Sequence, residues 1–374
     1  MNTTRPSSTL YTMTSWQKKQ AAMLYYYSSL DYLRGLHEMV TDLINNDVDG
    51  FLKKANTQDR DKFLFSKRWG HRNTSKNWVN NAWPALKDLQ VSLARQIAQR
   101  PQGIYSFTAV NDRLRALSEY SLDWMTNEEE KIFQKSLAVI TEYDNPLYDI
   151  LSQPDNHMDD FIFAAIYESF SSGRTSIPKF KVRLDVTAST GEPTPVTGAY
   201  PPLDDPHATL QFARAKNGMK LRHANTFNKM GLDALNYTGR TDLWFNEKKM
   251  FEFADQQIYA DKFRDWIYTS GCPSMGSAPG GVAMHAFEPR DCKWALVEIV
   301  PDQTELLATL DEPAALTETP TERLRAGAMC SRDGFYLTPA VQHSRQFFRS
   351  GDIMPDATSQ YGMTDWIWDV DQMA

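Results

Sequence analysis

The sequence has few cysteines and no long apolar run. Its 374 residues include three cysteines, Cys272, Cys292 and Cys330, and none of them forms a C-x-x-C pair. So few thiols, in an odd number, argue against a disulfide scaffold and predict that they stay reduced. No stretch approaches the 18 consecutive apolar residues of a transmembrane helix. The first twenty residues lack the apolar region of a secretory signal, so we expect a cytoplasmic protein.

Sequence patterns of common catalytic and metal sites are also missing. The seven histidines form no H-E-x-x-H or H-x-H pattern, and there is no G-x-S-x-G. His157, Asp159 and Asp160 could hold a cation, but the acidic start of a solvated helix is the favoured interpretation. We therefore expect no metal and no cofactor.

One stretch invites a catalytic interpretation. Cys272 and Ser274 stand in a glycine-rich loop, and His285 follows thirteen residues after Cys272. Glycine and proline there are explained more simply by a tight, rigid loop, so we expect that the protein is not an enzyme. The loop also lacks the G-x-G-x-x-G of dinucleotide sites and the Lys-Ser/Thr of a P-loop.

Apolar periodicity predicts helices in the first half of the chain. Leucine, isoleucine and valine recur at steps of three and four, which is typical of amphipathic helices. The spacing predicts one long helix from Ser15 to Ile44, ended by Asn45-Asn46-Asp47, and a helix behind Pro84. Thr126-Asn-Glu-Glu predicts a capping box at the start of another helix. Further helices are expected near residues 110–117, 157–170, 206–216 and 246–268.

The second half changes to a two-residue period. Phe180, Val182, Leu184 and Val186 alternate with polar residues, which predicts a half-buried strand, and a second strand is expected over 294–300. The fold class predicted is α+β, mostly α, with an N-terminal helical bundle and a smaller mixed or β-rich C-terminal part. The expected parts are a disordered N-terminus (1–13), the bundle (14–175), a mixed α/β region with long loops (176–324) and a small β-rich cap (325–374).

Charge is uneven along the chain. The formal net charge is −7, which argues against direct nucleic-acid binding; we also expect no membrane partner. Residues 123–160 hold ten acids and two lysines, whereas residues 53–76 are locally basic. Solvated helix faces explain the acidic stretch most simply, and a docking surface for a basic protein is the alternative. Its first candidate contact residues are Glu128, Glu129, Glu130, Asp159 and Asp160.

The last hundred residues carry a distinctive set of motifs. They are Arg325-Ala-Gly327, Cys330, Gly334-Phe-Tyr-Leu-Thr338-Pro339, Ser344-Arg345, Met354-Pro355, Tyr361-Gly362, Trp366 and Trp368-Asp369. This set resembles the immunity proteins of bacterial polymorphic-toxin and type VI secretion systems. Alternation places Trp366 and Trp368 on one face of a strand, where core packing is the favoured role.

The resemblance implies a mostly helical protein that neutralises a cognate toxin by binding it. A cytoplasmic immunity protein would guard against a toxin that acts in the cytosol, such as a nuclease, and an acidic inhibitor suits a basic nuclease cleft. Two alternatives stay open: an enzyme that reverses toxin damage, and a cytosolic adaptor or scaffold. The sequence does not indicate an oligomeric state.

Overall fold

The chain divides into two compact units, Met1–Ala308 and Thr309–Ala374, which are treated separately here. The computed structural model describes residues 11–65, 68–152, 158–256, 275–311, 323–338, 344–356 and 364–368. The fold is mixed α+β, as predicted, with helices up to residue 171 and sheets with short helices after it. Among the described helices, none combines the length and the apolar character needed to cross a bilayer.

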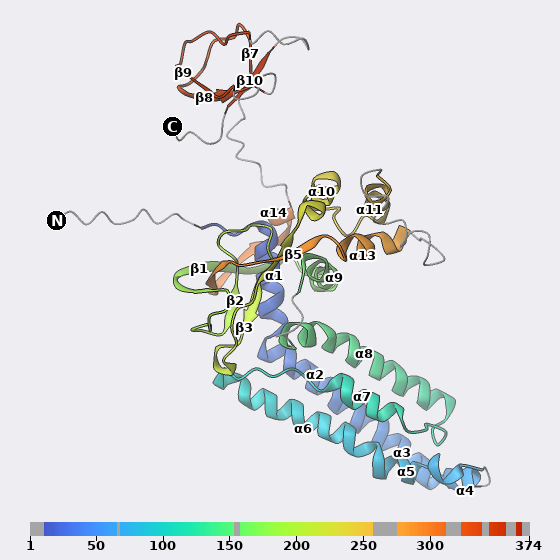
Figure 1. Ribbon diagram of the computed structural model, residues 1–374. Coiled ribbons are helices and arrows are strands. Elements are labelled where there is room, and N and C mark those ends of the chain that lie inside the picture. Colours follow the sequence, from blue (N-terminus) through green and yellow to red (C-terminus); the bar gives the residue numbers. More distant parts are fainter. Residues whose placement is uncertain are drawn as a thin grey trace, which may run out of the picture. The chain divides into compact units, whose positions relative to one another are not determined.

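Most helices of the first unit form an elongated bundle (Figure 1). The helices are α1 (Ser15–Tyr27), α2 (Leu30–Asp42), the π-helical turn η1 (Leu43–Val48), α3 (Asp49–Thr57), α4 (Arg60–Phe65), η2 (Gly70–Arg72), α5 (Ser75–Asn81), α6 (Trp83–Gln99), η3 (Arg100–Gln102), α7 (Val110–Ser118), α8 (Asn127–Leu151) and α9 (Asp160–Ser171). The apolar positions of α2 and α6 repeat every three to four residues, and those facing the core are fully buried, among them Leu33, Leu36, Leu86 and Leu89.

The single long helix predicted from Ser15 to Ile44 is wrong. Ser29 interrupts it, because its side chain accepts a hydrogen bond from the Tyr32 N–H and so starts a new helix, α2. The predicted stop at Asn45-Asn46-Asp47 is also wrong, since these residues lie in η1 and the chain stays helical to Thr57. Asn45 and Asn46 face solvent while the neighbouring Ile44 is fully buried, so the polar residues do not end the run.

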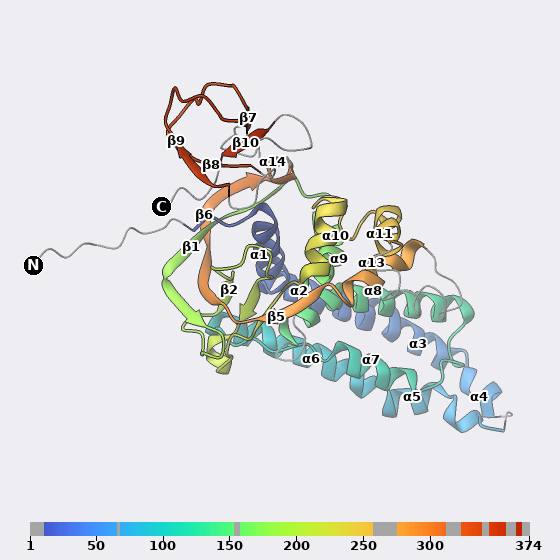
Figure 2. The ribbon, with the colours of Figure 1, turned by 45° about the horizontal axis from the view of Figure 1, so that its top comes forward.

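The rest of the first unit is built around two antiparallel sheets. One has the order β1-β6-β2-β3, and the other pairs β4 with β5. Figure 2 shows β1 and β6 side by side along their length. The strands are β1 (Ser176–Ser189), β2 (Gly198–Tyr200), β3 (Gln211–Ala213), β4 (Ala224–Phe227), β5 (Phe287–Arg290) and β6 (Lys293–Leu306). The helices are η4 (Ala215–Asn217), α10 (Lys229–Thr238), α11 (Glu247–Ala254), η5 (Met275–Ser277) and α13 (Ala278–Ala283). Helix α14 (Leu307–Asp311) spans the boundary between the two units.

The strand predictions are confirmed, and the helix predictions of this region are corrected. The helix expected over 206–216 is wrong, because residues 211–213 are buried in β3 and pair with β2, so tertiary pairing overrides local pattern. The helix expected over 246–268 is described only as α11, which ends at Ala254, and residues 257–274 lie outside the described residues. The glycine-rich loop is expected over residues 271–281, but residues 275–281 are helical, in η5 and α13.

Helix α1 joins the bundle to the larger sheet. The Tyr25 hydroxyl donates a hydrogen bond to the Val297 carbonyl in β6 and accepts one from the Ala199 N–H in β2. Gly198 makes room for this contact, since a Cβ there would lie 2.8 Å from the Tyr25 Oη and 2.7 Å from a Leu296 methyl carbon. The helical and mixed parts of the chain therefore pack together within one unit.

The second unit contains a small antiparallel sheet of order β7-β10-β8-β9. Its strands are β7 (Arg323–Arg325), β8 (Gly334–Leu337), β9 (Gln346–Phe348) and β10 (Asp365–Trp368). Cys330, Tyr336, Phe348, Met354 and Trp366 form its core. The short aromatic runs of the last fifty residues thus form strands, as the sequence predicts.

At the other terminus, residues 1–10 of the expected disordered segment lie outside the described residues. From Tyr11 on the chain is placed. The Tyr11 hydroxyl donates to the Pro202 carbonyl over 2.9 Å, and Met13 is buried. Residues 11–13 therefore pack onto the first unit.

Candidate functional site

Glu128, Glu129 and Glu130 occupy the first turn of α8, with different roles. Glu128 and Glu130 face solvent, but Glu129 is buried. Its side chain accepts from the Thr126 N–H in the predicted capping box, and it pairs with Arg60 over 2.5 Å. Although burial raises the pKa of Glu129, the hydrogen bonds from Arg60 and Thr126 hold it below its ordinary value. Glu129 therefore stabilises the bundle and is not available as a contact residue.

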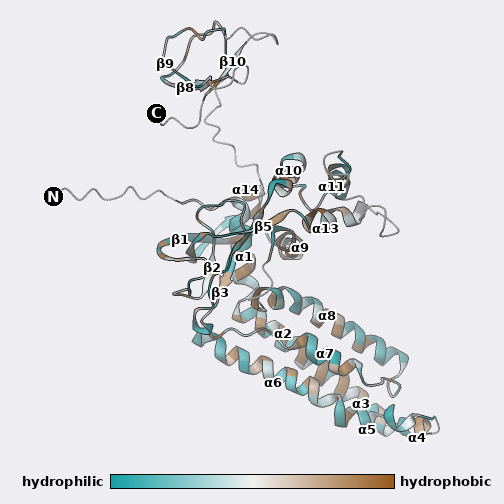
Figure 3. Cartoon of the chain, in the orientation of Figure 1, coloured by the Kyte–Doolittle hydropathy of each residue, from teal (hydrophilic) through white to brown (hydrophobic). Residues whose placement is uncertain are grey.

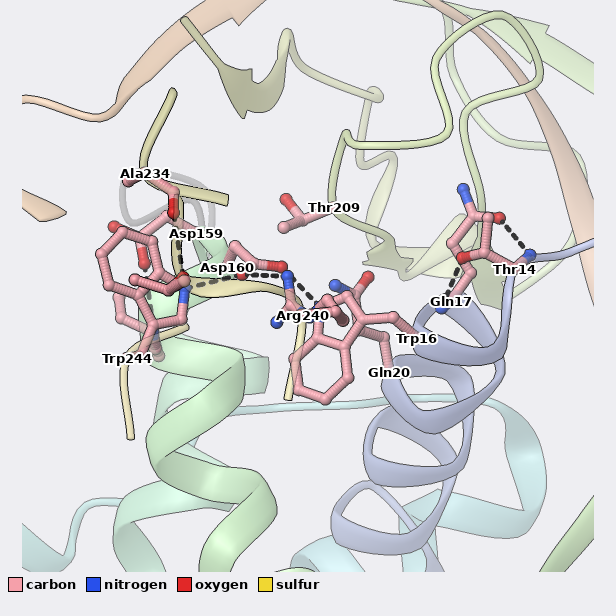
Figure 4. A network of polar contacts seen from close by, with 12 residues as sticks. Thr14, Trp16, Gln17, Gln20, Asp159, Asp160, Thr209, Ala234, Arg240 and Trp244 are labelled. Carbon is pink, nitrogen blue, oxygen red and sulfur yellow. Dashed lines mark hydrogen bonds and ion pairs between the residues drawn. The ribbon is translucent and has the colours of Figure 1, made fainter. Parts of the chain in front are cut away.

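Asp160 is also buried, in the polar network of Figure 4. Its carboxylate accepts hydrogen bonds from the Trp16 indole (2.5 Å), the Arg240 guanidinium (2.7 Å) and the Trp244 indole (2.7 Å). The Arg240 guanidinium also stacks over the Trp16 ring, 4.2 Å from its centroid. Asp160 thus ties α9 to α1 and to the segment before α11, so the expectation that it contacts a partner is corrected.

Asp159 caps α9. Its Oδ1 accepts the Ile162 N–H over 2.8 Å, and burial raises its pKa to about 6. Of the three residues weighed as a cation site, His157 lies outside the described residues, and Asp160 already serves three donors. Within the described ranges, no group of three or more His, Cys, Asp or Glu side chains is placed to hold a metal ion.

The proposed catalytic centre is described at one position only. Cys272 and Ser274 lie outside the described residues. His285 follows α13, is half-buried, and its carbonyl oxygen accepts from the Asn228 side-chain amide over 2.8 Å. No geometry for a Cys/His or Ser/His pair follows from these positions.

The C-terminal motif residues that the structure describes hold the second unit together. Gly334 pairs with Phe348 between β8 and β9, and the buried Trp366 donates its indole N–H to the Pro355 carbonyl over 2.7 Å. The Thr338 N–H donates to the Ser344 hydroxyl. The Arg345 guanidinium stacks on Phe335, 3.9 Å from the ring centroid.

These contacts assign packing roles to Gly334, Thr338 and Trp366, which are buried, whereas Arg345 and Pro355 are exposed. The core position predicted for Trp366 is confirmed. Pro339 and Gly362 lie outside the described residues. Trp368 is placed by its backbone in β10, opposite Tyr336.

Two open pockets, of about 530 and 510 Å³, lie along α8 beside α2, and Val139 lines both. We call them together the α2–α8 groove and each pocket one half of it; α1 and α9 also line the first half. One half is aromatic, with Tyr26, Tyr27, Tyr32, Tyr143 and Phe170 in its wall. The other is apolar with a polar edge, lined by Met39, Asp42, Leu43, Asn46, Asp47, Ile132, Lys135, Ser136, Val139 and Ile140.

The aromatic half is rigid because two tyrosines lock α2 to α8. The rings of Tyr32 and Tyr143 stack with centroids 4.1 Å apart and an interplanar angle of 7°. The Tyr32 hydroxyl donates to the Tyr143 carbonyl over 2.7 Å. Gly35 permits this approach, since a Cβ there would lie 2.5 Å from the Tyr143 Oη. Burial raises the pKa of Tyr143 to about 12, so this hydroxyl stays protonated.

The apolar half presents hydrophobic side chains to solvent beside carboxylates. Ile132 is 46% exposed and Val139 is 44% exposed, two helical turns apart on α8. Asp42 and Asp47 lie on the facing side, where η1 bulges, and π-helical turns are frequent at functional sites. The groove therefore combines an apolar strip with an acidic edge.

One sequence pattern indicates the exposed apolar strip of this groove. Phe133 and Ile140 form the buried stripe of α8, and Ile132 and Val139 lie one residue before each of them. A second apolar stripe beside the buried one widens the apolar face beyond what the bundle core covers.

Comparisons with known proteins complete the description of this site. No family model, no curated protein and no solved structure matches this chain.

Proposed function

We propose that this chain is an immunity protein that binds a cognate secreted bacterial toxin in a stoichiometric complex and blocks it. The resemblance of the last hundred residues supports this proposal. Within the described part of that region, Gly334, Thr338 and Trp366 are buried, whereas Arg345 and Pro355 are exposed. In the first unit, the α2–α8 groove is the candidate contact surface.

The observation that carries the proposal is the exposed apolar strip in this groove. Ile132 and Val139 leave apolar area open to water between two helices, which is the geometry that receives an amphipathic helix of a partner. Exposed apolar patches with a polar border mark such binding surfaces on other proteins.

The charge around the groove suggests the kind of toxin. Asp42 lies at its edge, and Glu38, Glu128, Glu130 and Glu142 are exposed on the same two helices. Acidic side chains around an apolar strip favour a basic partner, because complementary potentials raise the association rate. A nuclease that acts in the cytosol, whose cleft must be basic to hold phosphates, is the partner that we propose.

The test is a pull-down of the full chain with the product of the neighbouring gene, followed by calorimetry at low and high salt. We expect a one-to-one complex that salt weakens. Changing Ile132→Asp and Val139→Asp together should weaken binding by about a hundredfold, since hot-spot residues carry most of the energy of an interface. The matched control is Val91→Asp, an exposed valine on α6.

Several results would decide between the candidates. Unchanged binding by the groove variant would remove the groove from the proposal, and unchanged binding by Glu128→Lys with Glu130→Lys would remove the acidic edge. Protection of cells without a complex, lost in a Cys272→Ala, Ser274→Ala double variant, would favour the enzyme that reverses toxin damage. Neither binding nor protection would favour the adaptor.

A further inference from the structure

The end of the bundle formed by α4 and η2 exposes three large aromatic side chains. Phe63 is 74% exposed, Phe65 is 60% exposed and Trp69 is 53% exposed. Figure 1 shows α4 at the far end of the bundle, and Figure 3 shows both hydrophilic and hydrophobic residues at this end. We call Phe63, Phe65 and Trp69, with the exposed bases around them, the aromatic tip. Three large apolar side chains exposed within seven residues of chain mark an interaction surface.

The tip is built and held in shape by its own backbone. Gly70 packs so closely against α4 that a Cβ there would lie 1.7 Å from the Leu64 carbonyl oxygen. Leu64 itself is buried, so the neighbouring Phe63 and Phe65 point away from the core. Asp61 links α4 to the start of α5, because its carboxylate accepts hydrogen bonds from the Ser75 N–H (2.7 Å) and hydroxyl (3.0 Å). The aromatic side chains are therefore presented by a fixed support.

The tip is basic although the protein as a whole is acidic. Residues 53–76 contain eight bases and two acids, against a net charge of −7 for the chain. Part of this positive charge is offset at the same end of the bundle, where Arg60 pairs with Glu129 and Asn73 donates to Asp123. Glu128 and Glu130 are exposed beside Glu129. The guanidinium groups of Arg68 and Arg72 lie 5.5 and 5.1 Å from the Trp69 ring centroid. The exposed bases of the tip are Lys53, Lys54, Lys62, Arg68, Arg72 and Lys76.

We propose that the aromatic tip binds the surface of an anionic phospholipid bilayer. Phenylalanine and tryptophan enter the boundary between headgroups and acyl chains, and lysine and arginine are attracted to the negative lipids around them. This inference is independent of the proposed immunity function, because it uses none of the groove residues. It departs from the expectation that the protein has no membrane partner.

Two features of the tip favour a bilayer over other anionic partners. Four of the six exposed bases that the structure describes there are lysines, and lysine is depleted in protein–protein interfaces whereas arginine is enriched. The aromatic side chains lie at the end of an elongated bundle: Phe63 and Phe65 belong to α4, and Trp69 directly precedes η2. Single-stranded nucleic acid is bound in grooves that track its backbone, whereas a bilayer accepts side chains that project from a convex end.

The test is co-sedimentation of the full chain with vesicles of two compositions. One is phosphatidylcholine alone, and the other has two parts phosphatidylcholine to one part phosphatidylglycerol. We expect the protein to pellet with the second and to be released by salt. Phe63→Ser with Phe65→Ser should reduce the apparent affinity about tenfold, and Lys53→Glu with Lys76→Glu should reduce it to a similar extent.

Matched controls separate the tip from general surface effects. Val91→Ser changes an exposed apolar residue on α6, and Lys179→Glu with Lys220→Glu reverses two exposed charges elsewhere in the first unit. All the substituted side chains are exposed, so the variants should keep the wild-type circular dichroism spectrum and unfolding temperature.

Three outcomes would overturn the inference. The first is equal sedimentation with the two kinds of vesicle. The second is loss of binding in the control variants as large as in the tip variants. The third is tip-dependent binding of a single-stranded oligonucleotide or of polyglutamate without binding to the anionic vesicles.

Discussion

Removing the Asp160 carboxylate should strongly destabilise the first unit. Asp160→Ala takes one acceptor away from three donors, Trp16, Trp244 and Arg240. The Trp244 indole is buried and would be left unpaired, at a cost of about 1–3 kcal/mol. The Arg240 side chain is one-third exposed, so its guanidinium regains water and adds less than a fully buried cation would.

We therefore expect the free energy of unfolding to fall by about 3 kcal/mol. In a unit of this size, such a loss lowers the unfolding temperature by about 5 °C. Far-UV circular dichroism during thermal and urea unfolding measures both quantities. The matched control is Glu130→Ala, an exposed acid from the same acidic stretch, which should change stability by less than about 0.5 kcal/mol. A loss below about 1 kcal/mol in Asp160→Ala would refute the structural role given to this carboxylate.

Three further perturbations test other parts of the first unit. Burial raises the pKa of Asp144 to about 6, so the folded state binds this proton more tightly than the unfolded state and stability falls as pH rises from about 4 to 6. Asp144→Asn, which keeps the acceptor for the Thr108 hydroxyl, should gain about 2 kcal/mol at pH 7 and almost nothing at pH 4 by urea unfolding; an equal effect at both pH values would contradict this. Gly35→Ala should cost about 1–3 kcal/mol through the clash with the Tyr143 hydroxyl, and Tyr143→Phe in the same chain should recover part of that loss in a double-mutant cycle. The pKa of the buried Cys292 thiol is raised to about 12, first by burial and then by Asp204, so mass spectrometry should find it unmodified by a thiol reagent at pH 8 until the protein is unfolded.

Features that depend on neighbouring residues in the sequence could be predicted. The capping box at Thr126 and the helix behind Pro84 follow from side chains within one helical turn, and both are confirmed. The alternation in β1 likewise identifies a strand without knowledge of its partner.

Features that depend on distant residues could not be predicted. Asp160 looks like an exposed acid at a helix start, because its partners Trp16 and Arg240 stand 144 and 80 residues away. Residues 211–213 form a strand because β2 offers a pairing edge, which no local pattern records. The groove could not be predicted for a similar reason. The pattern of α8 identifies its apolar residues but does not show which of them the bundle leaves exposed to solvent.

Several residues of the C-terminal motif are buried within the second unit, so they determine its fold rather than its surface. Gly334, Thr338 and Trp366 are held by contacts within a unit that extends only from Thr309 to Ala374. Residues of this kind are constrained by packing, while exposed side chains such as Ile132 and Val139 can be replaced without loss of the fold. A search pattern built on the C-terminal motif would therefore collect chains that share this small sheet, whatever surface their helical bundles expose.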